Sequence, residues 1–203
     1  MQTIILATKN AGKVREIKDM TGDLCRVLTM TEAGITLDVE ETGTTFAENA
    51  YLKARAVWEA RRKAGFSDTV ISDDSGIEID FFDRQPGIYS SRWLGEQTPY
   101  TIKNQIVLER MQDVPEDKRT ARYVCAMTAI LPDGRDLRVL ETVEGRIAHA
   151  PAGSGGFGYD PIFLIPEAGL TFAEMPAEDK HAISHRGKAL RALEALLKQE
   201  GIL

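Results

Sequence analysis

The chain has 203 residues, of which 43% are hydrophobic and 28% charged, and its formal net charge is −6. This composition is typical of a globular chain that is long enough for one sizeable core or two lobes. It argues against a binder of nucleic-acid polymers, which depends on many Lys and Arg residues, and no apolar run approaches the roughly 20 residues of a membrane span.

The first predicted elements are a strand, a polar turn and a helix. Residues 2–7 form an apolar run typical of a buried strand, and residues 14, 17 and 20 repeat with helical spacing. Backbone N–H groups at a helix start attract anions, and a lysine adds a full charge. A phosphate-binding turn is therefore one interpretation, and an ordinary Thr or Asn helix cap is the alternative. The turn consists of Thr8, Lys9, Asn10, Ala11, Gly12 and Lys13.

A short strand over 26–30 precedes a longer helix, which is predicted to start at a capping box of Thr45 and Glu48 and to end near Ala64. Two acidic residues, Glu40 and Glu41, lie just before this helix. A polar stripe with a spacing of four residues follows one of its faces, and a solvated surface is the favoured interpretation of such a stripe. The stripe consists of Thr45, Asn49 and Lys53.

The central feature of the sequence is the acidic stretch Ser-Asp-Asp-Ser-Gly at 72–76. Strand-like runs at 69–71 and 77–81 flank it, so a sharp bend is expected at Gly76 and the serines. Neighbouring side chains of an extended chain point to opposite faces, and Asp73 and Asp74 are therefore expected to have separate tasks. Ordinary turn residues without any chemistry are the alternative.

The second half of the chain is predicted to begin with a helix that starts at Thr98, ends near Met111 and carries Ile102, Ile106 and Val107. A long, nearly apolar strand over 122–131 follows. Residues 132–134 turn the chain, and residues 136–143 return as an antiparallel partner.

A glycine-rich stretch at 151–161 contains four glycines within 153–158. Such a stretch lets the backbone approach a ligand, and Phe157 and Tyr159 could stack on a base; a flexible loop is the alternative. Near the end of the chain, His185 and Arg186 lie at the start of an amphipathic helix, with Lys180 just before them.

Two observations concern the compartment. The N-terminus has no basic segment followed by a cleavage site, so no signal peptide is expected. Cys25 and Cys125 lie in apolar runs without metal-ligand spacing and are expected to be buried thiols. A cytoplasmic, reduced protein is the resulting expectation.

Taken together, these segments resemble the inosine triphosphate pyrophosphatase family, the house-cleaning enzymes that hydrolyse deaminated purine nucleoside triphosphates. The resemblance runs nearly from end to end. It rests on seven motifs in order: Thr8-x-Asn10-x-x-Lys13, the run from Glu41 to Ala50, Lys53-Ala54, Asp73-Asp74-Ser75-Gly76, the run from Pro86 to Ser90, the run from Gly155 to Pro161, and Ser184-His185-Arg186-Gly187.

The resemblance implies an α/β fold with a long bent mixed sheet flanked by helices, two lobes with a central nucleotide cleft, and a homodimer built from one domain spanning 1–203. It implies Mg²⁺-dependent release of pyrophosphate from ITP, dITP and XTP. By match, Glu41 and Asp74 would hold the metal, and Asp74 would also act on the attacking water. Residues 8–13 and Lys53 would hold the triphosphate, and Ser75 would contact the substrate. The base and sugar would be surrounded by Phe157, Gly158, Tyr159, Asp160, Lys180, His185 and Arg186.

The chemistry agrees with this assignment. Mg²⁺ prefers oxygen ligands, and the lysines would act as point charges on the phosphates. A role for Asp73 as a further metal ligand, or in stabilising the bend, stays open. Two other functions also stay open: a pyrophosphatase for modified pyrimidine or methylated nucleotides, and a nucleotide-sensing module without catalysis. The second is disfavoured because a pure anion binder gains nothing from added carboxylates.

Overall fold

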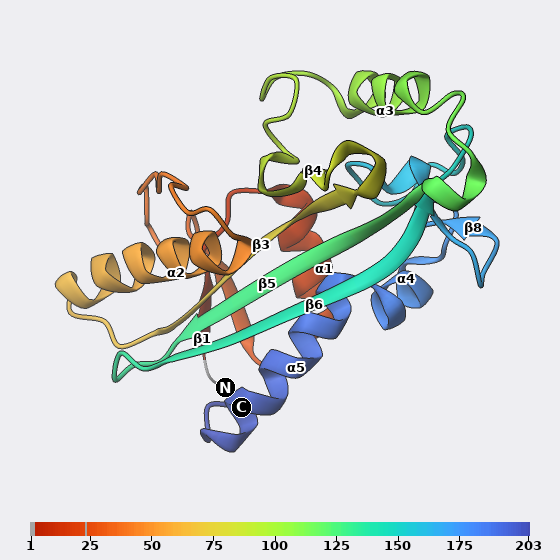
Figure 1. The fold of residues 1–203 in the computed structure, drawn as a ribbon. Coiled ribbons are helices and arrows are strands. Elements are labelled where there is room, and N and C mark those ends of the chain that lie inside the picture. The colour runs from red at the N-terminus through yellow and green to blue at the C-terminus, as the bar shows by residue number, and fades with distance from the viewer. Residues whose placement is uncertain (1–2, 23) are drawn as a thin grey trace. The chain divides into compact units, whose positions relative to one another are not determined.

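The computed structural model describes residues 3–22 and 24–203 (Figure 1). Residue 2, which the sequence placed in the first strand, lies outside them. The strands are β1 (Thr3–Leu6), β2 (Arg26–Thr29), β3 (Thr69–Ile79), β4 (Gln85–Pro86), β5 (Thr120–Ile130), β6 (Asp136–Ile147), β7 (Phe163–Ile165) and β8 (Leu170–Thr171). The α-helices are α1 (Ala11–Thr21), α2 (Phe46–Lys63), α3 (Tyr100–Arg110), α4 (Ala177–Ile183) and α5 (His185–Gln199).

All eight of these strands belong to one sheet in the order β2-β1-β3-β5-β6-β7-β8, with β4 paired to β3. Strand β1 pairs in parallel with β2 and β3, whereas β7 pairs antiparallel with β6 and β8. The sheet is therefore mixed, and the predicted α/β class is confirmed.

The acidic stretch does not form the predicted bend. Strand β3 runs without interruption through Ser72–Gly76 and ends at Ile79, where a 3₁₀ turn over Asp80–Phe82 replaces the predicted end of the second strand. Gly76 serves a different purpose, since a Cβ at this position would clash with the carbonyl oxygen of Gly87 and the hydroxyl of Ser90. The glycine allows close packing against the sheet, and both aspartates lie within the strand.

The chain divides into two compact units. Unit 1 comprises Met1–Asp74, Cys125–Glu141 and Arg186–Leu203, and unit 2 comprises Ser75–Val124 and Thr142–His185. The chain therefore passes from one unit to the other at four places along the sequence.

In unit 1, helices cover both faces of the sheet, as can be followed in Figure 1. Because strand side chains alternate between faces, Ile4 and Leu6 of β1 pack with α1 and α5, whereas Ile5 and Ala7 pack with α2. The capping box predicted at the start of α2 is present, and the helix ends at Lys63, as expected from the sequence.

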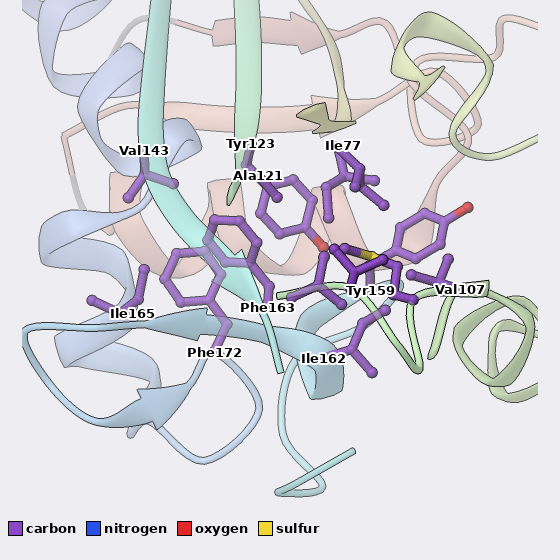
Figure 2. Close-up of a cluster of buried hydrophobic side chains, with 14 of the residues drawn as sticks. Ile77, Val107, Ala121, Tyr123, Val143, Tyr159, Ile162, Phe163, Ile165 and Phe172 are labelled. Carbon is purple, nitrogen blue, oxygen red and sulfur yellow. The ribbon is translucent and has the colours of Figure 1, made fainter. Parts of the chain in front are cut away.

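The core of unit 2 gathers apolar side chains from the strands β3, β5, β6 and β7 and from α3, and it contains several aromatic rings (Figure 2). Helix α3 lies close to the predicted range, and Val107 is buried, but Ile102 is not. Ile102 is 49% exposed, whereas Lys103 and Asn104 are buried. Lys103 donates to the carbonyl of Ser91, and Asn104 donates to the carbonyl of Gly158. The helix is therefore held partly by polar contacts, which apolar spacing cannot reveal.

Two further predictions are confirmed within the described residues. Cys25 and Cys125 are buried free thiols. The C-terminal helix α5 is amphipathic as predicted, because Leu190, Leu193 and Leu197 are buried along one face. No helix in the described ranges has both the length and the apolar character needed to cross a bilayer.

Candidate active site

In unit 1, two carboxylates from distant segments meet at one ammonium group. Lys53 Nζ of α2 lies 2.6 Å from Glu41 Oε1 and 3.2 Å from Asp74 Oδ1 of β3. The three side chains are between 8% and 20% exposed. The second carboxylate oxygen of Asp74 is buried and has no hydrogen-bond partner among the described residues. A buried anionic oxygen of this kind is costly unless a ligand contacts it.

Asp73 points to a different set of cations, as the strand alternation predicted. Its Oδ2 lies 2.9 Å from Lys13 Nζ of α1 and 3.5 Å from Arg186 Nη2 of α5. Arg186 is also paired with Glu16 of α1. All four side chains belong to unit 1, and Asp73 is fully buried. The structure therefore brings Lys13 and Arg186 together through a carboxylate whose role the sequence left open.

The surroundings displace the pKa values of the two neighbouring aspartates in opposite directions. Burial raises the pKa of Asp73, but Lys13 and Arg186 together outweigh burial and hold this pKa well below its usual range. Burial also raises the pKa of Asp74, and here Lys53 and Lys13 do not fully offset it. For Lys53, burial lowers the pKa, yet the surrounding carboxylates raise it above its usual value. Asp73 is thus the more firmly ionised carboxylate.

The polar turn before α1 forms a capped helix start. Asn10 Oδ1 accepts the N–H of Lys13 at 3.1 Å, and the N–H of Asn10 donates to Thr8 Oγ1 at 3.2 Å. The helix begins at Ala11, followed by Gly12, so its first N–H groups lie in this turn. The ammonium of Lys9 instead pairs with Asp38 at the surface.

The polar stripe on α2 is not a solvated face, and the sequence-based interpretation was wrong on this point. Asn49 is fully buried, and its side-chain oxygen accepts the N–H of Gly43 at 2.8 Å. Its amide nitrogen has no hydrogen-bond partner among the described residues. Because Gly43 lies two residues after Glu41, this contact fixes the segment that carries Glu41 toward Lys53.

In unit 2, the buried carboxylate of Asp160 holds several groups at once. Its Oδ2 accepts the backbone N–H of Phe157 and the ammonium of Lys180, both at 2.7 Å. Its Oδ1 accepts the hydroxyl of Tyr123 at 3.2 Å. Gly156 is needed here, because a Cβ at this position would clash with the Asp160 carboxylate.

The glycine-rich loop is tied to the rest of unit 2. Gly155 donates its N–H to the carbonyl of Ala173 at 2.9 Å, and the carbonyl of Gly158 accepts from Asn104. Tyr159 lies in the core, 2% exposed, with its hydroxyl donating to the carbonyl of Ser90. The half-buried ring of Phe157 lies 5.3 Å from the ammonium of Lys180.

His185 is buried, and its imidazole stacks on the ring of Tyr123 with a centroid distance of 4.6 Å and an interplanar angle of 5°. Ser75, half-buried in β3, is the first residue of unit 2. The site residues predicted from the resemblance therefore lie in two groups: Glu41, Lys53, Asp74, Lys13 and Arg186 in unit 1, and Phe157, Asp160, Lys180 and His185 in unit 2. The base-binding role of Arg186 stays a prediction, because its guanidinium lies on the carboxylates of Glu16 and Asp73.

Sequence reasoning missed several residues of these groups. Glu16 lies three residues after Lys13, so the carboxylate and the ammonium lie on the same side of the helix. Glu16 also precedes the buried Ile17. The spacing of Lys13 and Glu16 could therefore have indicated a role for Glu16. The four-residue polar stripe predicts a solvated Asn49, whereas this side chain is buried. Nothing in the apolar strand pattern around Tyr123 indicated a contact with His185, since that contact joins residues far apart in the chain.

Comparison with known proteins identifies the family of the chain. A family model described as the Ham1 family matches residues 4–196. The chain belongs to the Ham1 family. A dITP/XTP pyrophosphatase of Exiguobacterium sibiricum is 47% identical over 195 residues, covering 96% of each chain. A dITP/XTP pyrophosphatase of Clostridium perfringens is 43% identical over the full length of both chains. Among solved structures, the Ham1 protein of Staphylococcus aureus matches with a TM-score of 0.84 and 38% identity, covering 98% of this chain and all of that one.

Proposed function

We propose that this Ham1-family chain is a nucleoside-triphosphate pyrophosphatase that hydrolyses dITP, ITP and XTP to the monophosphate and pyrophosphate. The observation that carries the proposal is the convergence of Glu41 and Asp74 on Lys53, with the second oxygen of Asp74 left without a partner in the described chain. The two relatives named above are dITP/XTP pyrophosphatases, which supports the substrate class.

The residues present fit a divalent metal ion, which we propose to be Mg²⁺. Glu41 and Asp74 would supply carboxylate oxygens, and phosphate oxygens and water would supply the other oxygen ligands that Mg²⁺ prefers. No group of three or more His, Cys, Asp and Glu side chains in the described ranges is placed to hold a metal alone, so the substrate would supply the other ligands. When bound, the ion would neutralise phosphate charge and lower the pKa of a water molecule.

The chain's own groups would do the remaining work on the triphosphate. Lys13 and the first N–H groups of α1 would bind phosphate oxygens, and Lys53 would exchange its carboxylate contacts for phosphate contacts. Asp73 would keep Lys13 in place. The free oxygen of Asp74 would orient the attacking water and accept its proton as the bond between the α-phosphorus and the bridging oxygen breaks.

The groups of unit 2 suit a 6-keto purine. Hypoxanthine and xanthine present an acceptor at position 6, whereas adenine presents a donor. Donors such as His185 and the Lys180 ammonium would pair with a keto oxygen, and adenine would leave them unpaired at about 1–3 kcal/mol for each buried group. This argument disfavours dATP as a substrate.

The test is hydrolysis of dITP, XTP, dATP and dGTP with and without Mg²⁺, with the products separated by ion-exchange chromatography. We expect pyrophosphate and the monophosphate from dITP and XTP, little from dATP, and almost none in EDTA. A panel of modified pyrimidine and methylated nucleotides is measured in parallel. Tight binding of dITP without any product would contradict the proposal and favour a sensing module.

We also propose, from the family resemblance, that the protein is a cytoplasmic homodimer. Sedimentation velocity measures the mass in solution directly. A single species of monomer mass at micromolar concentration would contradict the dimer.

A further inference from the structure

Tyr123 is a buried residue of unit 2 that has no role in the proposed reaction as described above. It lies on β5 with 7% of its surface exposed, among the apolar side chains of the core (Figure 2). Phe163 meets its ring edge-on at a centroid distance of 4.7 Å, and Phe172 lies nearly parallel to it at 5.9 Å. The ring is therefore held rigidly by its neighbours.

The imidazole of His185 stacks on the same ring. The two planes are almost parallel, 5° apart, with centroids 4.6 Å apart, so the tyrosine sets the tilt of the histidine ring. The direction in which an imidazole N–H points is decided by that tilt. Offset stacking of this kind contributes about 0.5–1.5 kcal/mol beyond simple burial.

The hydroxyl of Tyr123 reaches a second group, because it donates to Asp160 Oδ1 at 3.2 Å. Burial and the nearby Asp160 raise the pKa of Tyr123 well above its usual value, so the hydroxyl keeps its proton. The other oxygen of Asp160 holds the Lys180 ammonium and the N–H of Phe157. One side chain thus contacts both the imidazole of His185 and the carboxylate that organises the glycine-rich loop.

We propose that Tyr123 is a positioning residue that determines base selectivity: its ring orients His185, and its hydroxyl orients Asp160 and, through it, Lys180 and the loop at Phe157. This inference rests on the proposed function, since it assigns the geometry of the base-binding groups of that reaction. The groups that Tyr123 contacts, His185 and Asp160, belong to the set proposed to bind the base, so its effect is expected on base recognition rather than on phosphate binding.

The test compares Tyr123→Leu, which removes the ring, with Tyr123→Phe, which keeps the ring and removes only the hydroxyl. Tripolyphosphate with Mg²⁺, a competitor without a base, is the probe for the phosphate-binding groups. For Tyr123→Leu we expect the KM for dITP to rise about tenfold, the preference for dITP over dATP to fall, and the inhibition constant of tripolyphosphate to stay unchanged. Tyr123→Phe is expected to restore most of the KM, leaving a rise of about threefold.

Val143→Ala is the matched control, because it opens the same core at a side chain without a ring or a hydrogen-bonding group. It is expected to lower the melting temperature without changing base preference. Parallel changes in the dITP KM and the tripolyphosphate constant would show a merely structural role and overturn the inference. If the leucine variant does not fold, the phenylalanine variant decides, and an unchanged KM there would overturn the inference. Absence of dITP hydrolysis by the unaltered protein would instead overturn the proposed function itself.

Discussion

The two groups of candidate site residues differ in how completely their polar atoms are hydrogen-bonded within the protein. In unit 1, Lys53 is shared by two carboxylates, and one oxygen of Asp74 has no partner among the described residues. In unit 2, both oxygens of Asp160 are bonded, and aromatic rings enclose Tyr123. The first group is suited to exchange partners when a metal ion and phosphates arrive. The second is organised in advance by packing, as selective recognition of a base requires.

The largest effect is expected from a substitution in the unit 1 group, at Asp74. Asp74→Asn removes the proton acceptor and should lower kcat about 1,000-fold, while nucleotide binding largely survives. Steady-state kinetics and calorimetric titration separate the two quantities. Asp80→Asn, at a carboxylate bonded to Arg122, is the control and should retain activity. Near-normal turnover by the Asp74 variant would remove this residue from its assigned role.

The next largest effect is expected from a substitution in the unit 2 group, at Asp160. Asp160→Asn leaves the buried ammonium of Lys180 without its charge partner and should lower the free energy of unfolding by about 3–5 kcal/mol. Urea denaturation measures this change. Asp133→Asn removes an exposed pair with Arg135, which solvent screens, and should change the free energy of unfolding far less. Similar losses in both variants would contradict the claim that Asp160 organises unit 2.

Lys13→Ala tests binding within the unit 1 group separately from its stability. It removes the charge proposed to bind phosphate but leaves Asp73 in contact with Arg186. The KM for dITP should rise about tenfold or more, since bonds to charged groups contribute about 1.5–3 kcal/mol. The melting temperature should change little by comparison. Unchanged KM and kcat would exclude Lys13 from the site.

The smallest effect concerns metal binding without catalysis. Lys53→Ala removes the cation shared by Glu41 and Asp74, so Mg²⁺ should raise the melting temperature of this variant about 2–4 °C more than that of the unaltered protein. Scanning calorimetry with Mg²⁺ or EDTA detects the difference. Lys18→Ala, at a surface pair with Glu32, should respond as the unaltered protein does. An equal response of both variants would argue against a metal at these carboxylates.

Much of the fold could be predicted from local patterns, because capping residues and apolar spacing act over a few positions. The capping box of α2 and the buried leucines of α5 are examples. The course of β3 could not, since Gly76 was needed for a close approach to Gly87 and Ser90 rather than for a bend. The separate surroundings of Asp73 and Asp74 followed from strand alternation. The partners of Arg186 and the stack of Tyr123 on His185 depend on contacts over long sequence separations, which no local pattern encodes.

The most direct test of the central claim is a crystal structure with Mn²⁺ and a dITP analogue whose α,β-bridging oxygen is replaced by an imido group. Manganese gives an anomalous signal that identifies the position of the ion directly. The account predicts an anomalous peak within coordination distance of both Glu41 and Asp74, with phosphate oxygens on Lys13 and Lys53. A peak far from these carboxylates, with the triphosphate bound elsewhere, would contradict it.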